Sequence, residues 1–487
     1  MDYTYGICFV LLRSFDMVFS SMTFLAFFLP AVIGLYFISQ SPKWRNGVLV
    51  VFSLLFYAWG EPQRIFLMLI SIVVNYICAI MISCAESKVQ KRIFLIVGLS
   101  VTIGMLVYFK YFAFFANFIA GIFGAKDLVP VQSLPIGISF FTFQIITYTV
   151  DVYLDKVKPQ RSLARLVLYI SFFPQLIAGP IVNYTYVSGQ LRKRKTTVNG
   201  VYEGLSRFAI GLAKKVLIAN VCGEILGELT LTGSASVLGA WLGAFAFSLQ
   251  IYFDFSGYSD MAIGLGRIFG FRFLENFNYP YISTSVTDFW RRWHISLGAF
   301  FREYVYIPMG GNRVSTGRHI VNLLTVWALT GLWHGASWNF IVWGLYYGLL
   351  LIAEKFLLKN FLAKLPKAVT WLGTMLLVMI GWVFFYHESL ADGLSQLGAM
   401  FFIGAEGLAD SVSVYYLKRY LGILAVGILA CVPWKQLFGQ KDGKYQTLKT
   451  ANSWADRLKA AAVFALMVVS LTFLVSSSYN PFLYFRF

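Results

Sequence analysis

The sequence predicts an all-α membrane protein that crosses the bilayer many times, and three observations lead to this fold class. Of the 487 residues, 58% are hydrophobic and only 13% are charged, which is about half the charged fraction of a soluble protein. The apolar residues form segments along the whole chain rather than one anchor. The net charge of +18 comes from bases in short loops, as the positive-inside rule expects. That placement gives no reason to expect a nucleic-acid partner.

Several apolar segments are shorter than the roughly 20 residues that a perpendicular helix needs to cross a bilayer. We therefore expect about eleven true crossings, with the other segments re-entrant or interfacial. The stretch F-F-P-Q-L-I-A-G-P-I at 172–181 is a re-entrant candidate, because Pro174 and Pro180 interrupt its helix. The apolar segments cover residues 22–39, 47–60, 65–84, 93–122, 135–150, 163–182, 201–222, 236–253, 320–334, 338–354, 369–387, 417–434 and 459–476.

Loop charges indicate an orientation. Bases at Lys43, Lys88 and Lys156 follow alternate apolar segments and would lie on one side, which is then the cytoplasmic side. The run Arg192–Lys195 falls on that side only if the stretch at 172–181 returns the chain to the face from which it entered.

The first sixteen residues differ from the rest, and Met17 opens the first recognisable motif. We interpret residues 1–16 as an extension without a structural role. Residues 17–487 are predicted to form a single membrane domain, whose motif-rich core covers 249–354.

The stretch from 249 to 312 is both aromatic and polar. Large apolar residues recur in it at helical spacing, while most of the neighbouring charged residues fall on other faces. This pattern predicts one amphipathic helix that lies at the membrane interface or lines a polar cavity. Its apolar positions are Phe289, Trp293, Leu297, Phe300 and Tyr304.

His334 lies in the longest stretch without Asp, Glu, Lys or Arg, from Ile320 to Ala353. A straight helix of that length would measure about 51 Å, against about 30 Å for a bilayer core. Gly331 and Gly335 are the predicted break. A polar group at membrane depth is costly and indicates function, and a neutral imidazole there can take a proton from a hydroxyl that attacks an acyl carbon.

The other candidates for proton transfer or metal binding are weaker. His294 lies among tryptophans, and is either an interfacial anchor or a functional group; His319 and His387 are expected to be solvated. The cysteines lack metal-ligand spacing and are interpreted as core residues. We expect no metal site and no tightly bound cofactor.

Asp254 and Asp260 are carboxylates in an apolar setting, six residues apart. They could form an ion or proton site. The alternative is a structural role, with hydrogen bonds to nearby serine or tyrosine hydroxyls or a pairing with Arg267.

The stretch Pro308–Arg313 is rich in glycine and is predicted to be a tight turn. Alternatively, free backbone N–H groups and the Arg313 side chain could hold a phosphate.

Several motifs in this order resemble the membrane-bound O-acyltransferase (MBOAT) family, and in particular its bacterial branch typified by the alginate O-acetylation protein. The resemblance covers nearly the whole chain. The motifs are M-V-F-S-S at 17–21, F-F-P-Q-L-I-A-G-P-I at 172–181, Y-F-D-F-S-G-Y-S-D-M-A-I-G at 252–264, D-F-W-R-R-W-H-I-S-L at 288–297, Y-I-P-M-G-G-N-R at 306–313, G-L-W-H-G-A-S-W at 331–338 and N-P-F-L-Y-F-R-F at 480–487.

The resemblance implies a ring of helices around a central cavity, with His334 as the catalytic histidine and His294 as the second motif histidine. It implies acetyl-CoA as a cytoplasmic donor, a bacterial cell membrane as the location, and an exopolysaccharide or cell-wall glycan as the final acceptor. Transfer would usually pass through an extracytoplasmic SGNH-type acetyltransferase. Candidate substrate-binding residues are Trp333, Asp254, Asp260, Trp290, Arg291, Asn312 and Arg313.

Two alternatives stay open. The related branch that transfers D-alanine to teichoic acid resembles the chain at the histidine motifs, although the segment I-P-M-G-G-N-R and the additional C-terminal apolar helices favour the acetylating branch. The other alternative is an ion-coupled transporter, in which Asp254, Asp260 and His334 would form a proton relay.

Overall fold

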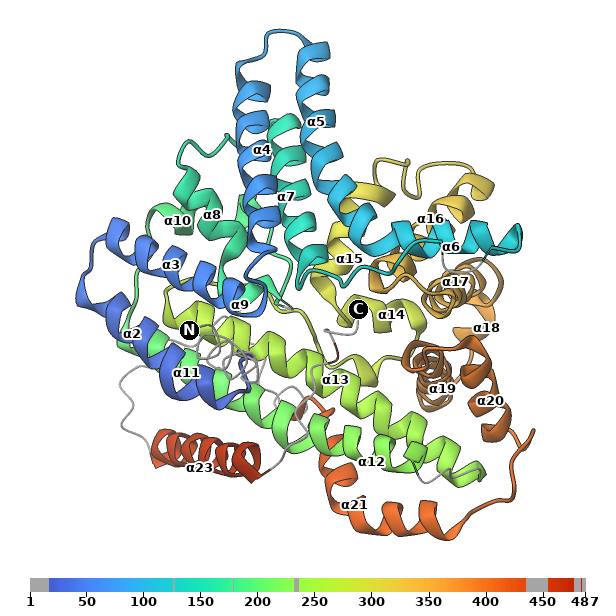
Figure 1. The fold of residues 1–487 in the computed structure, drawn as a ribbon. Coiled ribbons are helices and arrows are strands. Elements are labelled where there is room, and N and C mark those ends of the chain that lie inside the picture. The colour runs from blue at the N-terminus through green and yellow to red at the C-terminus, as the bar shows by residue number, and fades with distance from the viewer. Residues whose placement is uncertain are drawn as a thin grey trace, which may run out of the picture. The chain divides into compact units, whose positions relative to one another are not determined.

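The computed structural model describes residues 17–125, 128–177, 179–231, 236–434, 454–476 and residue 483. The predicted extension, residues 1–16, lies outside the described residues. Regular secondary structure within the described ranges is helical throughout, as the sequence predicts (Figure 1). The chain divides into two compact units, each assembled from separated stretches. The predicted single domain from 17 to 487 stays a prediction.

The first unit takes the described parts of Met1–Leu212, Tyr258–Leu274 and Met467–Ser478. Its helices are mostly the amino-terminal apolar segments, and several continue through a π-helical turn. They are η1 (Phe24–Phe28), α2 (Leu29–Ile38), α3 (Pro42–Gly60), α4 (Ile65–Cys84), α5 (Lys88–Leu106), η2 (Val107–Phe112), α6 (Ala113–Ile122), α7 (Ile138–Tyr153), α8 (Leu163–Ser171), α9 (Phe173–Leu176), α10 (Tyr184–Arg192) and α11 (Val198–Ala213).

Helices α4, α5 and α7 pack side by side in this unit (Figure 1). Buried polar groups join them: Asn75 of α4 donates to Thr102 Oγ1 of α5 at 2.7 Å and accepts from Thr149 Oγ1 of α7 at 2.8 Å. A buried polar group costs free energy unless it is hydrogen-bonded, so this contact fixes which faces of the three helices meet.

The predicted interruption at 172–181 is confirmed. Helix α8 ends at Ser171, the single turn α9 ends at Leu176, and α10 begins only at Tyr184. Ile181 and Val182, in the non-helical stretch between α9 and α10, are buried. Non-helical backbone at membrane depth is tolerated where protein surrounds it.

The second unit takes the described parts of Ala213–Gly257, Glu275–Leu466 and Tyr479–Phe487. Helix α13 (Val237–Ile268) contributes its first part to this unit and its last part to the other, and α23 (Trp454–Ser476) is likewise divided. The remaining helices are η3 (Lys214–Ala219), α12 (Asn220–Leu231), η4 (Pro280–Ile282), α14 (Val286–Arg292), α15 (Ile295–Phe301), η5 (Arg302–Tyr306), α16 (Thr316–His334), α17 (Trp338–Ile352), η6 (Ala353–Leu357), α18 (Lys359–Leu362), α19 (Lys367–Tyr386), α20 (Leu390–Met400) and α21 (Ser411–Ala430).

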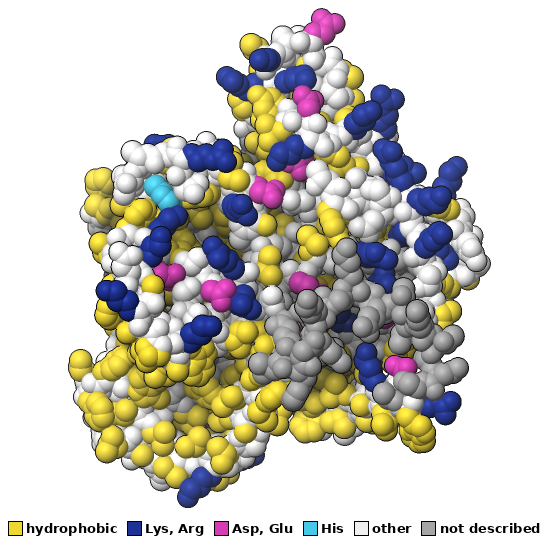
Figure 2. Space-filling view, turned by 180° about the vertical axis from the view of Figure 1, so that it is seen from behind, with side chains coloured by type: hydrophobic (Ala, Val, Ile, Leu, Met, Phe, Trp, Pro, Cys, Tyr) yellow, Lys and Arg dark blue, Asp and Glu magenta, His cyan; other side chains and the backbone are white. Residues whose placement is uncertain are grey.

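Seven helices among the described residues are long and apolar enough to cross a membrane. Many of their large apolar side chains face outward, and Figure 2 shows extended hydrophobic areas on the surface. Outward-facing apolar residues on this scale are what lipid contact requires. The protein is therefore a multi-pass membrane protein, while the number of eleven crossings and the ring around a central cavity stay predictions. The seven spans are Ile65–Cys84, Lys88–Ile122, Val237–Ile268, Trp338–Leu357, Lys367–Tyr386, Ser411–Ala430 and Asp456–Ser476.

Candidate functional site

His334 is the last residue of α16, and the helix breaks where the sequence predicts. Gly335 is extended, with φ of −173°, and α17 begins at Trp338. The two helices then pack closely: a Cβ on Gly331 would lie 2.2 Å from the carbonyl oxygen of Phe340. That atom belongs to the backbone and cannot swing away, so glycine is required for this approach. The break leaves the His334 imidazole buried, with 5% of the residue exposed.

His294 lies at a second break, and here the predicted continuous amphipathic helix is wrong. Helix α14 ends at Arg292, and His294 adopts a left-handed conformation with φ of 46° before α15 begins. Asn276 holds this turn, because its carbonyl accepts from the Ile295 N–H at 2.9 Å and its side-chain oxygen accepts from the Ser296 N–H at 3.1 Å. A left-handed conformation is unusual for histidine and often marks functional sites.

The start of α14 is held from another helix. The Glu354 carboxylate accepts from the backbone N–H groups of Val286 at 2.8 Å and Thr287 at 3.2 Å. The Ser285 hydroxyl accepts from the Asp288 N–H at 3.0 Å. A carboxylate at a helix N-terminus satisfies unpaired donors and complements the helix dipole. Both ends of the short helix that precedes His294 are therefore fixed.

Trp333 brings the two histidines into one cluster, although forty residues separate them in the chain. The centroid of its indole lies 5.8 Å from that of the His294 ring and 4.8 Å from that of the His334 ring. His334 also contacts Trp343 and Phe385, each with 5.0 Å between ring centroids. Both imidazoles thus stand against aromatic surfaces, which exclude water.

Further aromatic rings continue this wall. Trp290 lies 4.7 Å from Trp327 and 4.8 Å from Tyr347, and Trp293 lies 4.8 Å from Trp382, measured between centroids. The predicted candidates Trp290 and Trp333 therefore lie in this aromatic wall, and their role in substrate binding stays a prediction.

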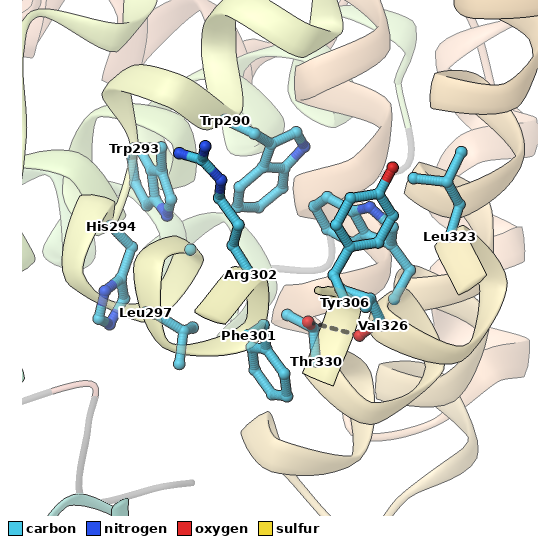
Figure 3. A pocket seen from close by; sticks show the side chains of 12 residues that line it. Trp290, Trp293, His294, Leu297, Phe301, Arg302, Tyr306, Leu323, Val326 and Thr330 are labelled. Carbon is cyan, nitrogen blue, oxygen red and sulfur yellow. Dashed lines mark hydrogen bonds between the residues drawn. The ribbon is translucent and has the colours of Figure 1, made fainter. Parts of the chain in front are cut away.

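A cavity of about 190 Å³ opens beside His294 (Figure 3). Gly298 and Arg302 on its lining are exposed and His294 is buried, so the cavity leads from the surface of this unit to the imidazole. In Figure 3, His294 and Leu297 lie at one end and Tyr306 and Leu323 at the other. The lining residues are Trp290, Trp293, His294, Leu297, Gly298, Phe301, Arg302, Tyr306, Leu323, Val326, Trp327 and Thr330.

His334 is not among the residues that line this cavity, but Thr330 is. Thr330 lies four residues before His334 on α16, so the two side chains share a face of the helix. The cavity therefore reaches His294 directly and ends one helical turn from His334.

The electrostatics of the cavity favour neutral or anionic groups. Burial lowers the pKa of His294 to about 3, so its imidazole is neutral at pH 7. The described residues that line the cavity include the Arg302 guanidinium and no Asp or Glu. A neutral imidazole can accept a proton or donate its own N–H to an oxygen, whereas a ligand ammonium would find no carboxylate here.

Asp254 is buried, and the predicted pairing with Arg267 is wrong. Its partners are the Lys215 ammonium and a backbone N–H group. Lys215 Nζ lies 2.7 Å from Asp254 Oδ1, and the Leu483 N–H donates to Oδ2 at 3.0 Å. The two side chains of this ion pair are 3% and 0% exposed. Arg267 pairs with Glu203 instead, at 2.9 Å.

Asp260 is likewise paired, with Arg207 Nη2 at 2.7 Å. The cations that pair with the two carboxylates, Lys215 and Arg207, both precede α13 in the chain, and no pattern in the sequence identifies them. Each carboxylate is neutralised by a cation, so the structural alternative fits both residues better than a proton relay.

Pro308–Arg313 forms the predicted tight turn, with positive φ at Gly310 and Gly311. The alternative of free backbone donors is wrong for four of its N–H groups, including that of Met309, which donates to the Val305 carbonyl oxygen at 3.1 Å. Those of Gly310, Gly311 and Arg313 donate to carbonyl oxygens within the turn or just before it, at 2.9 to 3.1 Å. The side chains of Asn312, Arg313 and the predicted candidate Arg291 are exposed.

The expectation of solvation is wrong for His319, which is 5% exposed. Its Nε2 lies 2.8 Å from the Tyr306 hydroxyl and 3.2 Å from Lys355 Nζ. His387 is half-buried and contacts Gln396 Oε1 through its Nε2.

Of the cysteines, Cys84 is exposed, Cys78, Cys222 and Cys431 are buried, and Cys8 lies outside the described residues.

Sequence reasoning missed Arg302, Tyr306, Thr330 and Trp327 in the cavity lining. One signal was present: Thr330 stands at i−4 from His334.

No group of three or more His, Cys, Asp or Glu in the described part of the chain could hold a metal ion.

These features define an integral membrane protein that buries two histidines among tryptophans beside an open cavity, an arrangement suited to acyl transfer. The MBOAT, membrane-bound O-acyltransferase family matches residues 154–396. Together with full-length relatives, this match shows that the chain belongs to that family and is an acyltransferase.

Several relatives span nearly the whole chain. It is 38% identical to the probable alginate O-acetylase AlgI of Azotobacter vinelandii, over 97% of this chain and 100% of that protein. It is 33% identical to the peptidoglycan O-acetyltransferase of Helicobacter pylori, over 98% and 99%. The teichoic acid D-alanyltransferase of Bacillus subtilis is 31% identical over 49% of this chain and 62% of that protein.

Proposed function

We propose that this enzyme takes an acetyl group from cytoplasmic acetyl-CoA and passes it across a bacterial cytoplasmic membrane. The acetyl group then reaches an exopolysaccharide or cell-wall glycan through an extracytoplasmic SGNH-type partner. The observation that carries the proposal is the pair of buried histidines that both contact the Trp333 ring, beside a cavity that leads to His294.

In the proposed reaction His334 is the general base. Its imidazole takes the proton of the acceptor hydroxyl while that oxygen attacks the carbonyl carbon of the thioester. The C–O bond forms, the C–S bond breaks, and the proton passes from the imidazolium to the leaving thiolate. No covalent bond to the enzyme and no metal ion is needed.

His294 is proposed to position the thioester. Its neutral imidazole can donate an N–H to the carbonyl oxygen and stabilise the charge that develops there. The surrounding Trp290, Trp293 and Trp333 exclude water, which would otherwise hydrolyse the thioester.

The charge of the cavity favours acetyl over D-alanyl transfer. A D-alanyl thioester carries an ammonium group, and the Arg302 guanidinium on the cavity lining would repel it. An acetyl group is neutral and needs no carboxylate partner. The full-length relatives named as O-acetylases and O-acetyltransferases support the same choice.

The test measures ester-linked acetate on the exported glycans of the source cells by mass spectrometry. Deletion of the protein should remove the acetyl groups, wild-type protein should restore them, and the His334→Ala variant should insert into the membrane without restoring them. The matched control is His387→Ala, which changes a histidine outside the Trp333 cluster and should restore acetylation. Restoration by His334→Ala would contradict the proposed role of this residue.

A further inference from the structure

His319, which the proposed reaction does not use, is connected to the cavity through Tyr306. The Tyr306 side chain lines the cavity, and its hydroxyl lies 2.8 Å from His319 Nε2. His319 belongs to the first turn of α16, whereas His334 ends the same helix. At about 1.5 Å per residue, the two histidines lie far apart along it, so His319 is not part of the Trp333 cluster.

The neighbours of His319 determine which ring nitrogen carries its proton. Lys355 Nζ lies 3.2 Å from the same Nε2, and an ammonium group only donates hydrogen bonds. The Nε2 atom that faces it must therefore be an acceptor, which puts the proton of the neutral imidazole on Nδ1. The one lone pair of Nε2 then accepts from both donors, the Tyr306 hydroxyl at 2.8 Å and the Lys355 ammonium at 3.2 Å. The lone pairs of the Tyr306 oxygen remain available to a ligand.

The other groups packed around His319 do not compete for this role. Phe356 contacts the ring with 5.4 Å between centroids and is apolar. The Glu354 carboxylate accepts from backbone N–H groups at the start of α14. The adjacent Arg318 is exposed. Burial and the Lys355 ammonium both lower the pKa of His319, so its imidazole is neutral at pH 7.

A second side chain on the same face of α16 holds the segment that follows Tyr306. Asn322, three residues after His319, donates from Nδ2 to the carbonyl oxygens of Met309 at 3.2 Å and Gly311 at 3.0 Å. Residues three apart on a helix face the same way. The position of Tyr306 is therefore set by α16 and not by its own turn alone.

We propose that His319 is a positioning residue for the acyl donor, because it fixes Tyr306 in the cavity wall with its oxygen turned into a hydrogen-bond acceptor. The ligand chemistry that this acceptor fits is an amide N–H, as carried by the arm of a pantetheine-type thioester. The inference rests on the proposed function, since it assumes that the donor enters this cavity.

The experiment measures steady-state acetyl transfer from acetyl-CoA by the full-length protein in lipid nanodiscs, with Tyr306→Phe, His319→Leu, His319→Gln and the Tyr306→Phe/His319→Leu pair. Tyr306→Phe keeps the ring and removes the oxygen, and His319→Leu removes the acceptor that orients it. Each single variant should raise KM for acetyl-CoA by about threefold to tenfold, the value of one hydrogen bond, with a smaller change in kcat.

The double variant should be no worse than either single variant, because both remove the same interaction. His319→Gln keeps an acceptor at the end of a similarly long side chain and should recover part of the loss. The wild-type KM should rise as the pH falls below the ordinary histidine range, since a protonated His319 donates to Tyr306 instead of accepting, and the KM of Tyr306→Phe should stay flat.

Several outcomes would overturn the inference. One is an unchanged KM in Tyr306→Phe, and others are fully additive effects or a loss confined to kcat. If His319→Leu fails to fold, Tyr306→Phe still decides, because it deletes a single oxygen. A wild-type protein that takes no acetyl group from acetyl-CoA would overturn the proposed donor and the inference with it, whereas an active wild type with unaffected variants would overturn the inference alone.

Discussion

Replacing Lys215 by methionine should destabilise the protein more than almost any other loss of a lysine. The substitution keeps most of the apolar side chain and removes the ammonium group, which lies 2.7 Å from Asp254 Oδ1. Both side chains are almost completely buried, at 3% and 0% exposure. Asp254 would keep the hydrogen bond from the Leu483 N–H but lose its countercharge. Removing one partner of a buried ion pair costs about 3–5 kcal/mol.

Unfolding of the purified protein in detergent micelles, followed by tryptophan fluorescence, measures this loss. The matched control is Lys91→Met, which breaks a Lys–Asp pair of 3.9 Å whose side chains are 28% and 82% exposed. Exposed pairs contribute about 0–1 kcal/mol, so the control should unfold almost as the wild type does. The double variant Lys215→Met/Asp254→Leu should recover much of the loss, because it leaves no buried charge. A Lys215→Met protein as stable as the control would refute this reasoning.

Three further predictions concern packing, pH and specificity. Gly331→Ala should destabilise the protein by about 2 kcal/mol or more, since its Cβ would meet the Phe340 carbonyl at 2.2 Å, whereas Gly317→Ala on the same helix meets nothing within 4 Å and should be neutral or stabilising in the same unfolding assay. The pKa of His294, lowered to about 3 from 6.5, makes the native state prefer the neutral form, so its stabilising contribution is complete above pH 6.5 and is lost as the pH falls. Between pH 7 and pH 5 the free energy of unfolding should drop by about 2 kcal/mol from this residue, and His294→Gln should lack that part of the pH dependence. Arg302→Gln should improve the use of a D-alanyl thioester relative to acetyl-CoA, measured as the ratio of the two kcat/KM values; an unchanged ratio would show that Arg302 does not govern this choice.

Parts of this structure follow from the sequence because the physical constraint is local. The break after His334 is one example: a charge-free stretch too long for one bilayer crossing must bend, and the nearby glycines allow it. The interruption after Ser171 follows in the same way from two prolines in a short apolar segment. The predicted tight turn at Pro308–Arg313 needs only the two glycines with positive φ.

Other parts depend on residues that are distant in the chain. The apolar spacing from Phe289 to Tyr304 fits one helix, yet Asn276 holds a left-handed turn at His294 and divides it. Asp254 finds its partner in Lys215, on another helix. His319 follows Arg318 in what reads as a loop, but Tyr306 and Lys355 enclose it. Periodicity shows which face of a helix is apolar, and does not show which distant polar group will meet it.

The most direct test of the proposed mechanism is a single-turnover reaction of the purified protein in nanodiscs with labelled acetyl-CoA and a glycan or carrier hydroxyl as acceptor. We expect His334→Gln to slow acetyl transfer by about 10²–10⁴-fold while its unfolding curve and its affinity for acetyl-CoA stay close to those of the wild type. His387→Gln, outside the Trp333 cluster, should react at the wild-type rate. Transfer at the wild-type rate by a folded His334→Gln protein would contradict the assignment of His334 as the general base.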